Sequence, residues 1–225
     1  MRPVLVIASS LLPFAALADE SGQLLTRDQC EPLYTVQKRG CVSEHVLRCE
    51  TPDGVIFRND LIEDGELRDV EFSDAEFEYV DSWNADGQKF LLEMVENRDP
   101  FSLTNLIETQ VDNIDQTALA DLQIVAPREV EIVATSAMTG DVQLIDGREI
   151  AEIAFIGTFD FSTMVWEVSG TIYLDRLTRT LFDGPVDIDI GGFTRTLPGE
   201  PVRILTEGDP GFMRDITLFD CGEQG

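Results

Sequence analysis

Residues 163–174, TMVWEVSGTIYL, alternate apolar and polar side chains, and this stretch decides the fold class. Met164, Trp166 and Val168 fall on one side of an extended chain, and the polar residues between them fall on the other. Leu174 continues the apolar side. A period of two residues is typical of a strand with one buried face, so the stretch predicts a half-buried β-strand.

The same alternation recurs along the chain from residue 66 onward. It is clearest in segments 70–72, 90–94, 130–138 and 186–190. Turn signals lie between these segments, at Asp53-Gly54, Asp64-Gly65, Asp86-Gly87, Thr139-Gly140, Asp146-Gly147, Asp183-Gly184 and Gly191-Gly192. This spacing predicts a meander of antiparallel hairpins.

One helix is expected, over residues 100–109, with Asp99 as its N-cap. Its apolar face would consist of Phe101, Leu103, Leu106 and Ile107. Residues 110–116 are polar and are expected to form a connection rather than a strand.

A long sheet with one apolar face has to hide that face, and one short helix covers little of it. We therefore expect a mainly β domain over residues 19–225, a single antiparallel meander closed as a half-barrel or a sandwich. The sheet either closes on its own core or shares a hollow with a ligand. Cavity volume separates the two, because a carrier needs a hollow of ~300 Å³ or more.

The first eighteen residues have the layout of a cleavable secretory signal. Arg2 provides a short basic start, residues 4–12 are mostly apolar, and small residues stand at Ala16 and Ala18. The apolar run is too short for a bilayer, which needs ~20 apolar residues, so no membrane anchor is expected. We predict cleavage after Ala18 and a periplasmic or secreted mature protein.

The chain is strongly acidic, with a formal net charge of −27 at pH 7. Such a surface repels phosphate backbones and anionic lipid heads, so nucleic acid is not expected as a partner. The partners that remain are cations, a basic protein, and neutral apolar small molecules or lipids.

The stretch CVSEHVLRC, residues 41–49, spaces Cys41, His45 and Cys49 as ligands of a metal could be spaced. A metal needs further ligands, whereas an even number of cysteines in an exported chain predicts disulfides. Turn residues bracket segment 42–50, which we interpret as a strand. Cys41 and Cys49 then lie ~26 Å apart, at ~3.3 Å per residue, and can neither pair with each other nor share an ion.

A hairpin with Arg39-Gly40 at its tip fixes the cysteine pairs. Paired positions then sum to 79, which places Lys38 opposite Cys41 and Cys30 opposite Cys49. The hypothesis is a Cys30–Cys49 disulfide and, from the remaining cysteines, a Cys41–Cys221 disulfide.

One segment matches much of the spacing of a calcium-binding loop. Its candidate ligands are Ser82, Asn84, Asp86 and Glu93. Ser82 stands where aspartate is usual, and Lys89 stands where an apolar residue is expected. The flanks alternate like strands, so a hairpin turn over residues 84–87 explains the same residues and is the favoured interpretation.

Motifs of familiar enzymes are missing from the sequence. Asp187 and Asp189 share a strand face, as a carboxylate pair for acid–base work would, but alternation alone explains them as a solvent face. There is no Gly-x-Ser-x-Gly elbow, no phosphate loop and no two-histidine zinc motif. We assign no catalytic residue, expect no cofactor, and favour a non-enzymatic role over a carboxylate-based hydrolase.

Residues 148–183, REIAEIAFIGTFDFSTMVWEVSGTIYLDRLTRTLFD, resemble adjacent strands of periplasmic lipoprotein-carrier domains of the LolA type. The resemblance rests on Trp166-x-Val168-x-Gly170, followed by Leu174-Asp175-x-x-Thr178 and a return strand. It implies a curved antiparallel sheet over a helix, with an apolar hollow for acyl chains. The four cysteines and the acidity depart from that family. The ending GDPGFMRDITLFDC resembles exported proteins of marine alphaproteobacteria, which implies a source and no function.

Two functional hypotheses follow. The first is a periplasmic binding or carrier protein for an apolar, lipid-like ligand. Its candidate lining residues are Phe155, Phe159, Met164, Trp166 and Val168. The second is a non-enzymatic acidic interaction module with a closed core, which meets a basic or strand-donating partner.

Overall fold

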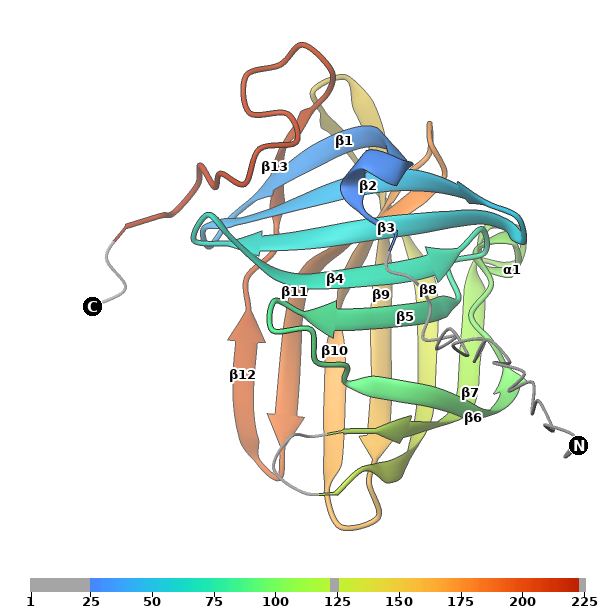
Figure 1. The fold of residues 1–225 in the computed structure, drawn as a ribbon. Helices are drawn as coiled ribbons and strands as arrows, with labels where there is room; N and C mark the ends of the chain where they lie inside the picture. Colours follow the sequence, from blue (N-terminus) through green and yellow to red (C-terminus); the bar gives the residue numbers. More distant parts are fainter. Residues whose placement is uncertain (1–24, 122–125, 223–225) are drawn as a thin grey trace, which may run out of the picture.

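The structure, a computed structural model, describes residues 25–121 and 126–222. The predicted signal segment, residues 1–18, lies outside the described residues. A six-stranded antiparallel sheet has the order β13-β1-β2-β3-β4-β5 and is shown in Figure 1. Its strands are β1 (Cys30–Lys38), β2 (Val42–Thr51), β3 (Gly54–Glu63), β4 (Glu66–Asp74), β5 (Tyr79–Asn84) and β13 (Pro201–Leu205).

A seven-stranded antiparallel sheet has the order β12-β11-β10-β9-β8-β7-β6. Its strands are β6 (Leu91–Asp99), β7 (Val111–Ala120), β8 (Arg128–Ile145), β9 (Arg148–Asp160), β10 (Val165–Asp175), β11 (Thr180–Ile190) and β12 (Phe193–Leu197). Among the described residues the helices are α1 (Leu103–Thr109) and the short 3-10 helix η1 (Arg27–Gln29).

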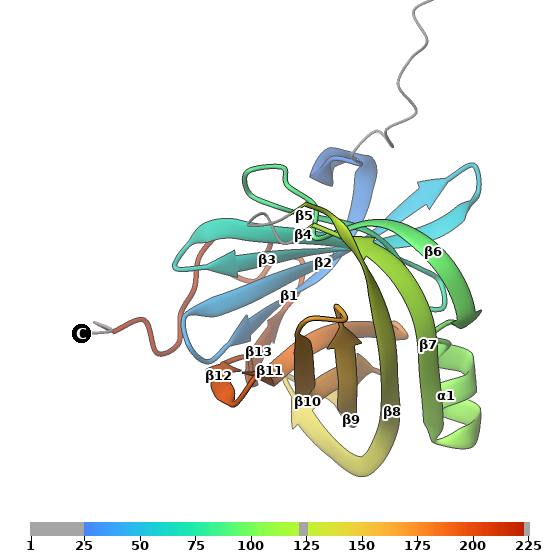
Figure 2. The ribbon, with the colours of Figure 1, turned by 90° about the horizontal axis from the view of Figure 1, so that it is seen from below.

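The two sheets pack with their strands running across one another (Figure 1), and the seven-stranded sheet curves round from β7 to β10 (Figure 2). Strands follow the chain order within each sheet, except that β13 returns to pair with β1. β5 and β6 are consecutive in the chain but belong to different sheets, so the ladder is interrupted between them. The prediction of a mainly β, antiparallel half-barrel or sandwich with one short helix is confirmed.

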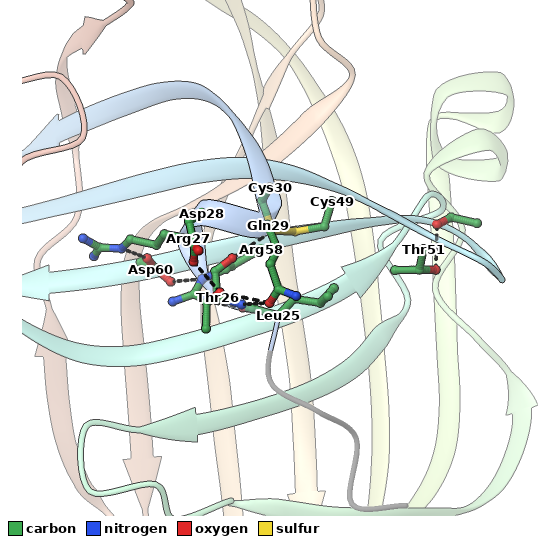
Figure 3. The surroundings of a disulfide bond; sticks show 11 residues. Leu25, Thr26, Arg27, Asp28, Gln29, Cys30, Cys49, Thr51, Arg58 and Asp60 are labelled. Carbon is green, nitrogen blue, oxygen red and sulfur yellow. Dashed lines mark hydrogen bonds and ion pairs between the residues drawn. A yellow bond between two sulfur atoms is a disulfide. The ribbon is translucent and has the colours of Figure 1, made fainter.

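Both predicted disulfides are present, Cys30–Cys49 and Cys41–Cys221. Cys30 pairs with Cys49 in the ladder, as the hairpin register predicted. Figure 3 shows this disulfide beside η1; in the same view the Asp60 carboxylate accepts hydrogen bonds from Arg27 and Arg58.

The predicted register is wrong near the hairpin tip. The register shifts by one residue between Pro32 and Tyr34, so Lys38 pairs with Val42 rather than with Cys41. The loop consequently has three residues, 39–41, and Cys41 has a positive φ of 60°. Because of this extra loop residue, Cys41 lies outside the ladder, and its sulfur forms the disulfide with Cys221.

The C-terminal segment, residues 206–221, covers the outer face of β1 and β2. The Gln37 amide and the Ser43 hydroxyl donate hydrogen bonds to the carbonyl of Ile216, at 3.0 and 3.1 Å. His45 Nε2 lies 3.1 Å from the Arg214 carbonyl oxygen, and burial is the main cause that lowers the pKa of His45. These polar residues are buried because the segment supplies backbone partners, and His45 is a sheet residue.

Helix α1 begins later than predicted. Asp99 is the last residue of β6, and the helix starts four residues later, so Asp99 does not cap it. Ser102 is the N-cap, and its hydroxyl accepts a hydrogen bond from the Asn105 amide at 3.1 Å. Of the predicted apolar face, Leu103 and Leu106 are buried, Phe101 packs against them, and Ile107 is exposed.

Three further local predictions are wrong. Residues 110–116 are mostly strand, since β7 begins at Val111; its polar Asp112 is buried as a partner of the Ser102 amide and the Asn105 side chain. Thr139-Gly140 lies at an irregularity inside β8, and Asp183-Gly184 lies inside β11, so neither is a hairpin turn. Irregular ladders at both places explain the glycines without a chain reversal.

Three apolar clusters fill the structure. The first joins the two sheets through Tyr34, Val36, Val46, Ile145, Ile150, Tyr173, Phe182 and Ile204. The second holds α1 against the seven-stranded sheet through Leu103, Leu106, Ala151, Ile153, Leu174 and Leu181. The third lies further along that sheet and contains Ala118, Ala120, Val130, Ile132 and Phe161.

The seven-stranded sheet is covered on both faces where it meets α1. Ile150 and Ala151 are successive residues of β9, so they point to opposite faces. Ile150 belongs to the first cluster, against the six-stranded sheet, and Ala151 belongs to the second, against the helix. Away from α1, the face that carries Ala151 also carries the functional candidates.

The disulfides should differ in what they contribute to stability. Cys41–Cys221 joins residues 180 apart in sequence, and Cys30–Cys49 joins residues 19 apart. In the chain-entropy model, loss of the longer link lowers the free energy of unfolding by about 5 kcal/mol and loss of the shorter by about 3 kcal/mol. Urea unfolding of the two paired Cys→Ala variants measures this, and a larger loss from removing Cys30–Cys49 would contradict it.

Candidate functional site

An apolar hollow of about 250 Å³ lies on the face of the seven-stranded sheet that carries Ala151, and it is open to solvent. It sits between the second and third clusters, because its lining includes members of both, such as Leu181 and Ile132. Its lining residues are Phe77, Tyr79, Leu91, Met94, Phe101, Ile114, Gln116, Ile132, Ala134, Ser136, Phe155, Phe159, Ile172 and Leu181.

Small residues of adjacent strands leave this space empty. Ala134 of β8 pairs with Gly157 of β9, and a Cβ atom on Gly157 would lie only 2.7 Å from the Ala134 Cβ. Phe155 and Phe159 stand two residues to either side of Gly157, on the same face of β9. The rings of Phe155 and Phe159 therefore flank the small residues Ala134 and Gly157.

The interruption between the sheets forms one wall of the hollow. Tyr79 of β5 and the β6 residues Leu91 and Met94 line it from the two strands that are not paired. The Tyr79 hydroxyl donates a hydrogen bond to the Leu91 carbonyl at 3.3 Å. Burial is the main cause that raises the pKa of Tyr79 to about 12, so the hydroxyl stays a donor at neutral pH. The hydrogen bond from the Tyr79 side chain therefore closes this wall, since no backbone ladder joins β5 to β6.

The predicted lining residues are brought together only in part. Phe155 and Phe159 line the hollow. Met164 and Trp166 pack against the third cluster beside it, where Trp166 stacks on Phe90 with 5.8 Å between ring centroids. Val168 shares the face of Trp166 on β10 but is not among the lining residues.

Sequence reasoning missed most of the opposite wall. Phe77 and Phe101 belong to loops on either side of the strands β5 and β6, and Phe77 stacks on Phe57 of β3 with 4.8 Å between ring centroids. Phe77 follows no periodic pattern, and the pattern that includes Phe101 assigned it to the face of the predicted helix rather than to a site. Their apolar character next to turn residues was the one available signal.

A second, acidic hollow of about 220 Å³ lies nearby, between the inner face of the six-stranded sheet and β11. Its lining residues are Glu44, Asn59, Leu61, Asp69, Val70, Glu71, Ser82 and Asp183. Asn59, Glu71 and Ser82 face one another across β3, β4 and β5. The inner face of these strands is polar. This part of the space between the sheets can therefore hold charged groups.

A buried ion pair anchors one end of the acidic hollow. The Lys38 ammonium contacts the Glu44 carboxylate, and both side chains are almost fully buried. Asn59 Nδ2 donates a second hydrogen bond to Glu44 at 2.6 Å, and the Asp183 amide donates a third at 3.3 Å. Burial is the main cause that raises the pKa of Glu44, and the Lys38 charge opposes it.

Glu71 has a strongly altered titration. The residue is exposed by its accessible surface, and it lines the acidic hollow. Desolvation by the surrounding protein atoms, and then the negative charges of Asp183 and Glu44, raise the pKa of Glu71 to about 8. Its carboxyl group therefore binds a proton over a wider pH range than that of an ordinary glutamate.

A wider polar hollow of about 460 Å³ adjoins the acidic one, and both contain Asp69 and Asp183. Basic and acidic side chains alternate around it, including Arg68, Arg195 and Glu63. This mixture of charges selects no ligand class, in contrast to the uniform lining of the apolar hollow.

The structure separates the predicted calcium ligands. Asn84 caps a turn: its side-chain oxygen accepts hydrogen bonds from the amides of Asp86 and Gln88, both at 3.0 Å. Ser82 faces the acidic hollow, and Glu93 lies on β6. Within residues 25–121 and 126–222, no group of three or more histidine, cysteine, aspartate or glutamate side chains is placed to hold a metal.

Asp187 and Asp189 have structural partners. The Thr196 hydroxyl donates a hydrogen bond to Asp187 at 2.5 Å, and the Thr194 hydroxyl donates one to Asp189 at 2.9 Å. Both carboxylates therefore stabilise the hairpin of β11 and β12 through hydrogen bonds between the two strands.

Comparisons of the chain with protein families, with curated proteins and with solved structures found no match. In the part of the chain that the structure describes, no helix is long and apolar enough to cross a membrane. The function therefore has to be argued from the hollows themselves.

The raised pKa of Glu71 predicts a pH-dependent stability. The folded state holds the Glu71 proton more tightly than the unfolded state, so this contribution to stability is full below pH ~4.5 and is lost as the pH rises to about 8. Glu71→Gln should therefore raise the Tm relative to wild type by an amount that grows from pH 5 to pH 8.5.

Glu129→Gln is the matched control, because it removes the same charge from an exposed position at the start of β8. Thermal melts of the three proteins across this pH range give the comparison. Equal shifts in Tm for the two variants at pH 8.5 would contradict the burial of Glu71.

Proposed function

We propose that this protein is an exported periplasmic binding or carrier protein for a small apolar ligand, which it holds in the apolar hollow. The observation that carries the proposal is an open space lined almost wholly by aromatic and aliphatic side chains, among them Phe77, Phe155 and Phe159. Ligand sites in proteins are typically concave and mostly apolar, with few polar groups.

The size of the hollow limits the ligand. Its 250 Å³ is below the ~300 Å³ expected of a carrier, so volume alone does not separate a carrier from a closed core here, and a drug-sized ligand is too large for the hollow. A whole lipid with several acyl chains does not fit this volume. The ligand is then a single short apolar chain or ring, or one such part of a larger lipid whose remainder lies outside.

Charge and compartment support the same function. A chain with a net charge of −27 repels anionic ligands, and neutral apolar molecules are among the partners that remain, beside cations and basic proteins. Two disulfides suit an oxidising compartment, as the secretory signal pattern of residues 1–18 does. The resemblance of residues 148–183 to carrier domains of the LolA type points in the same direction.

Native mass spectrometry of protein purified from a bacterial periplasm tests the proposal. Wild-type protein should carry a defined extra mass, or acquire one from a lipid mixture, and an organic extract should contain the compound. Ala134→Leu should abolish this mass, because Ala134 lines the hollow and the longer side chain fills it. Ile114→Phe, which fills the hollow from β7, is a second blocking variant.

Val133→Leu is the matched control, since Val133 is the neighbouring residue on the opposite face of β8 and is 48% exposed. It should keep the bound mass. A wild-type protein that stays bare after incubation with lipids would contradict the proposal and favour the closed-core interaction module.

A further inference from the structure

Ser136 is a polar side chain with no partner at the edge of the apolar hollow. It is 0% exposed, and its hydroxyl oxygen has no hydrogen-bond partner. It lies on β8 two residues beyond Ala134, on the same face, and it lines the hollow. A buried hydroxyl without a partner is destabilising, so natural proteins rarely keep one without a use.

No hydrogen bond joins the Ser136 hydroxyl to its neighbours. Its cross-strand neighbours are Asp112 on β7 and Phe155 on β9. The two carboxylate oxygens of Asp112 already accept from the Ser102 amide, at 3.0 Å, and from the Asn105 side chain, at 2.6 Å. The Phe155 ring has no conventional hydrogen-bond donor or acceptor.

Two other polar side chains of the lining make hydrogen bonds. Gln116 Nε2 donates to Asn97 Oδ1 at 2.9 Å, and the Tyr79 hydroxyl bonds to the Leu91 carbonyl. The Ser136 hydroxyl is the buried side-chain oxygen of the lining that has no partner.

The charges around the hollow restrict which chemical group of a ligand can bond to Ser136. The lining contains no lysine or arginine, so nothing there neutralises a carboxylate or phosphate. The carboxylate of Asp112, beside Ser136 in the ladder, repels an anion further.

We propose that Ser136 is the polar anchor of the ligand site, and that the ligand is an uncharged apolar molecule with one hydrogen-bonding oxygen, such as a ketone, ester or alcohol, rather than a fatty acid. This inference rests on the proposed function and adds the chemical class of the ligand to it. The hydroxyl donates to a ketone or ester oxygen and can accept from an alcohol.

Three probes with the same carbon skeleton separate the alternatives: n-propylbenzene, propiophenone and 3-phenylpropanoate. Binding is followed by NMR on protein with ¹³C-labelled methionine methyl groups. Met94 lines the hollow and reports binding there. Met213 lies in the segment over the outer face of the six-stranded sheet, where its amide bonds to Thr35, and it reports non-specific effects.

Propylbenzene and propiophenone should shift the Met94 signal and leave the Met213 signal in place, whereas 3-phenylpropanoate at pH 7.5 should shift neither. Ser136→Ala should weaken propiophenone binding about 3- to 10-fold, the usual effect of one neutral hydrogen bond, and change propylbenzene binding less than about twofold. Its Tm should not fall, because the hydroxyl that it removes has no partner.

Ser169→Ala is the matched control, since Ser169 is exposed on β10, and it should leave both affinities unchanged. If Ser136→Ala weakens both neutral probes equally or neither, apolar binding stands and the anchor is overturned. Binding of 3-phenylpropanoate as tight as that of propiophenone overturns the uncharged class. If none of the probes shifts Met94, the proposed function fails, and the anchor fails with it.

Discussion

The face of the seven-stranded sheet that carries Ala151, Phe155 and Phe159 is larger than the elements that cover it, and the rest of the structure follows from this mismatch. The six-stranded sheet packs against the other face of the same hairpins, through Tyr34, Val36 and Val46. Helix α1 covers one part of the first face. Between α1 and the third cluster no helix covers it, and the small residues Ala134 and Gly157 leave a hollow, with Tyr79 of β5 at one wall. A complete ladder between β5 and β6 would close the fold, but these strands belong to different sheets.

The six-stranded sheet contributes apolar packing only toward β1 and β2. Its outer face is polar and is buried under the C-terminal segment, which Cys41–Cys221 ties in place. Its inner face is polar along β3 to β5, where Asn59 and Glu71 stand, and is apolar only toward β1 and β2. The two kinds of inner surface divide the space between the sheets into an acidic part and an apolar part. Under the proposed function, a neutral ligand would occupy the apolar part, because the acidic part is lined by charged side chains.

Sequence periodicity predicted the strands well, since alternation in segments such as 163–174 depends only on which side chains face inward. The disulfides followed from one hairpin register, yet the same register was wrong at Lys38, because the irregularity between Pro32 and Tyr34 has no marker in the sequence. β7 was not predicted as a strand because Asp112 and Gln116 are polar. In the structure, the Asp112 side chain accepts a hydrogen bond from α1, and the Gln116 side chain bonds to Asn97 on the adjacent strand β6. Polar residues with long-range partners look like loop residues in a single sequence.

The site was predictable only on the strand that carries its own pattern. Phe155 and Phe159 were found because they alternate along β9, whereas Phe77 and Phe101 reach the hollow from loops. Ser136 could not be recognised, because its significance is the absence of a partner, which requires the positions of all its neighbours. The acidic hollow was equally invisible: Glu44, Glu71 and Asp183 come from three strands that only the tertiary fold brings together.

The most direct test of the central claim is a crystal structure of the mature protein under xenon pressure, because xenon enters empty apolar cavities and leaves polar ones. Xenon should occupy the space bounded by Phe77, Phe155 and Phe159, and the acidic hollow beside Glu71 should contain ordered water. A crystal in which those aromatic rings close over Ala134, so that no xenon binds there, would contradict the account.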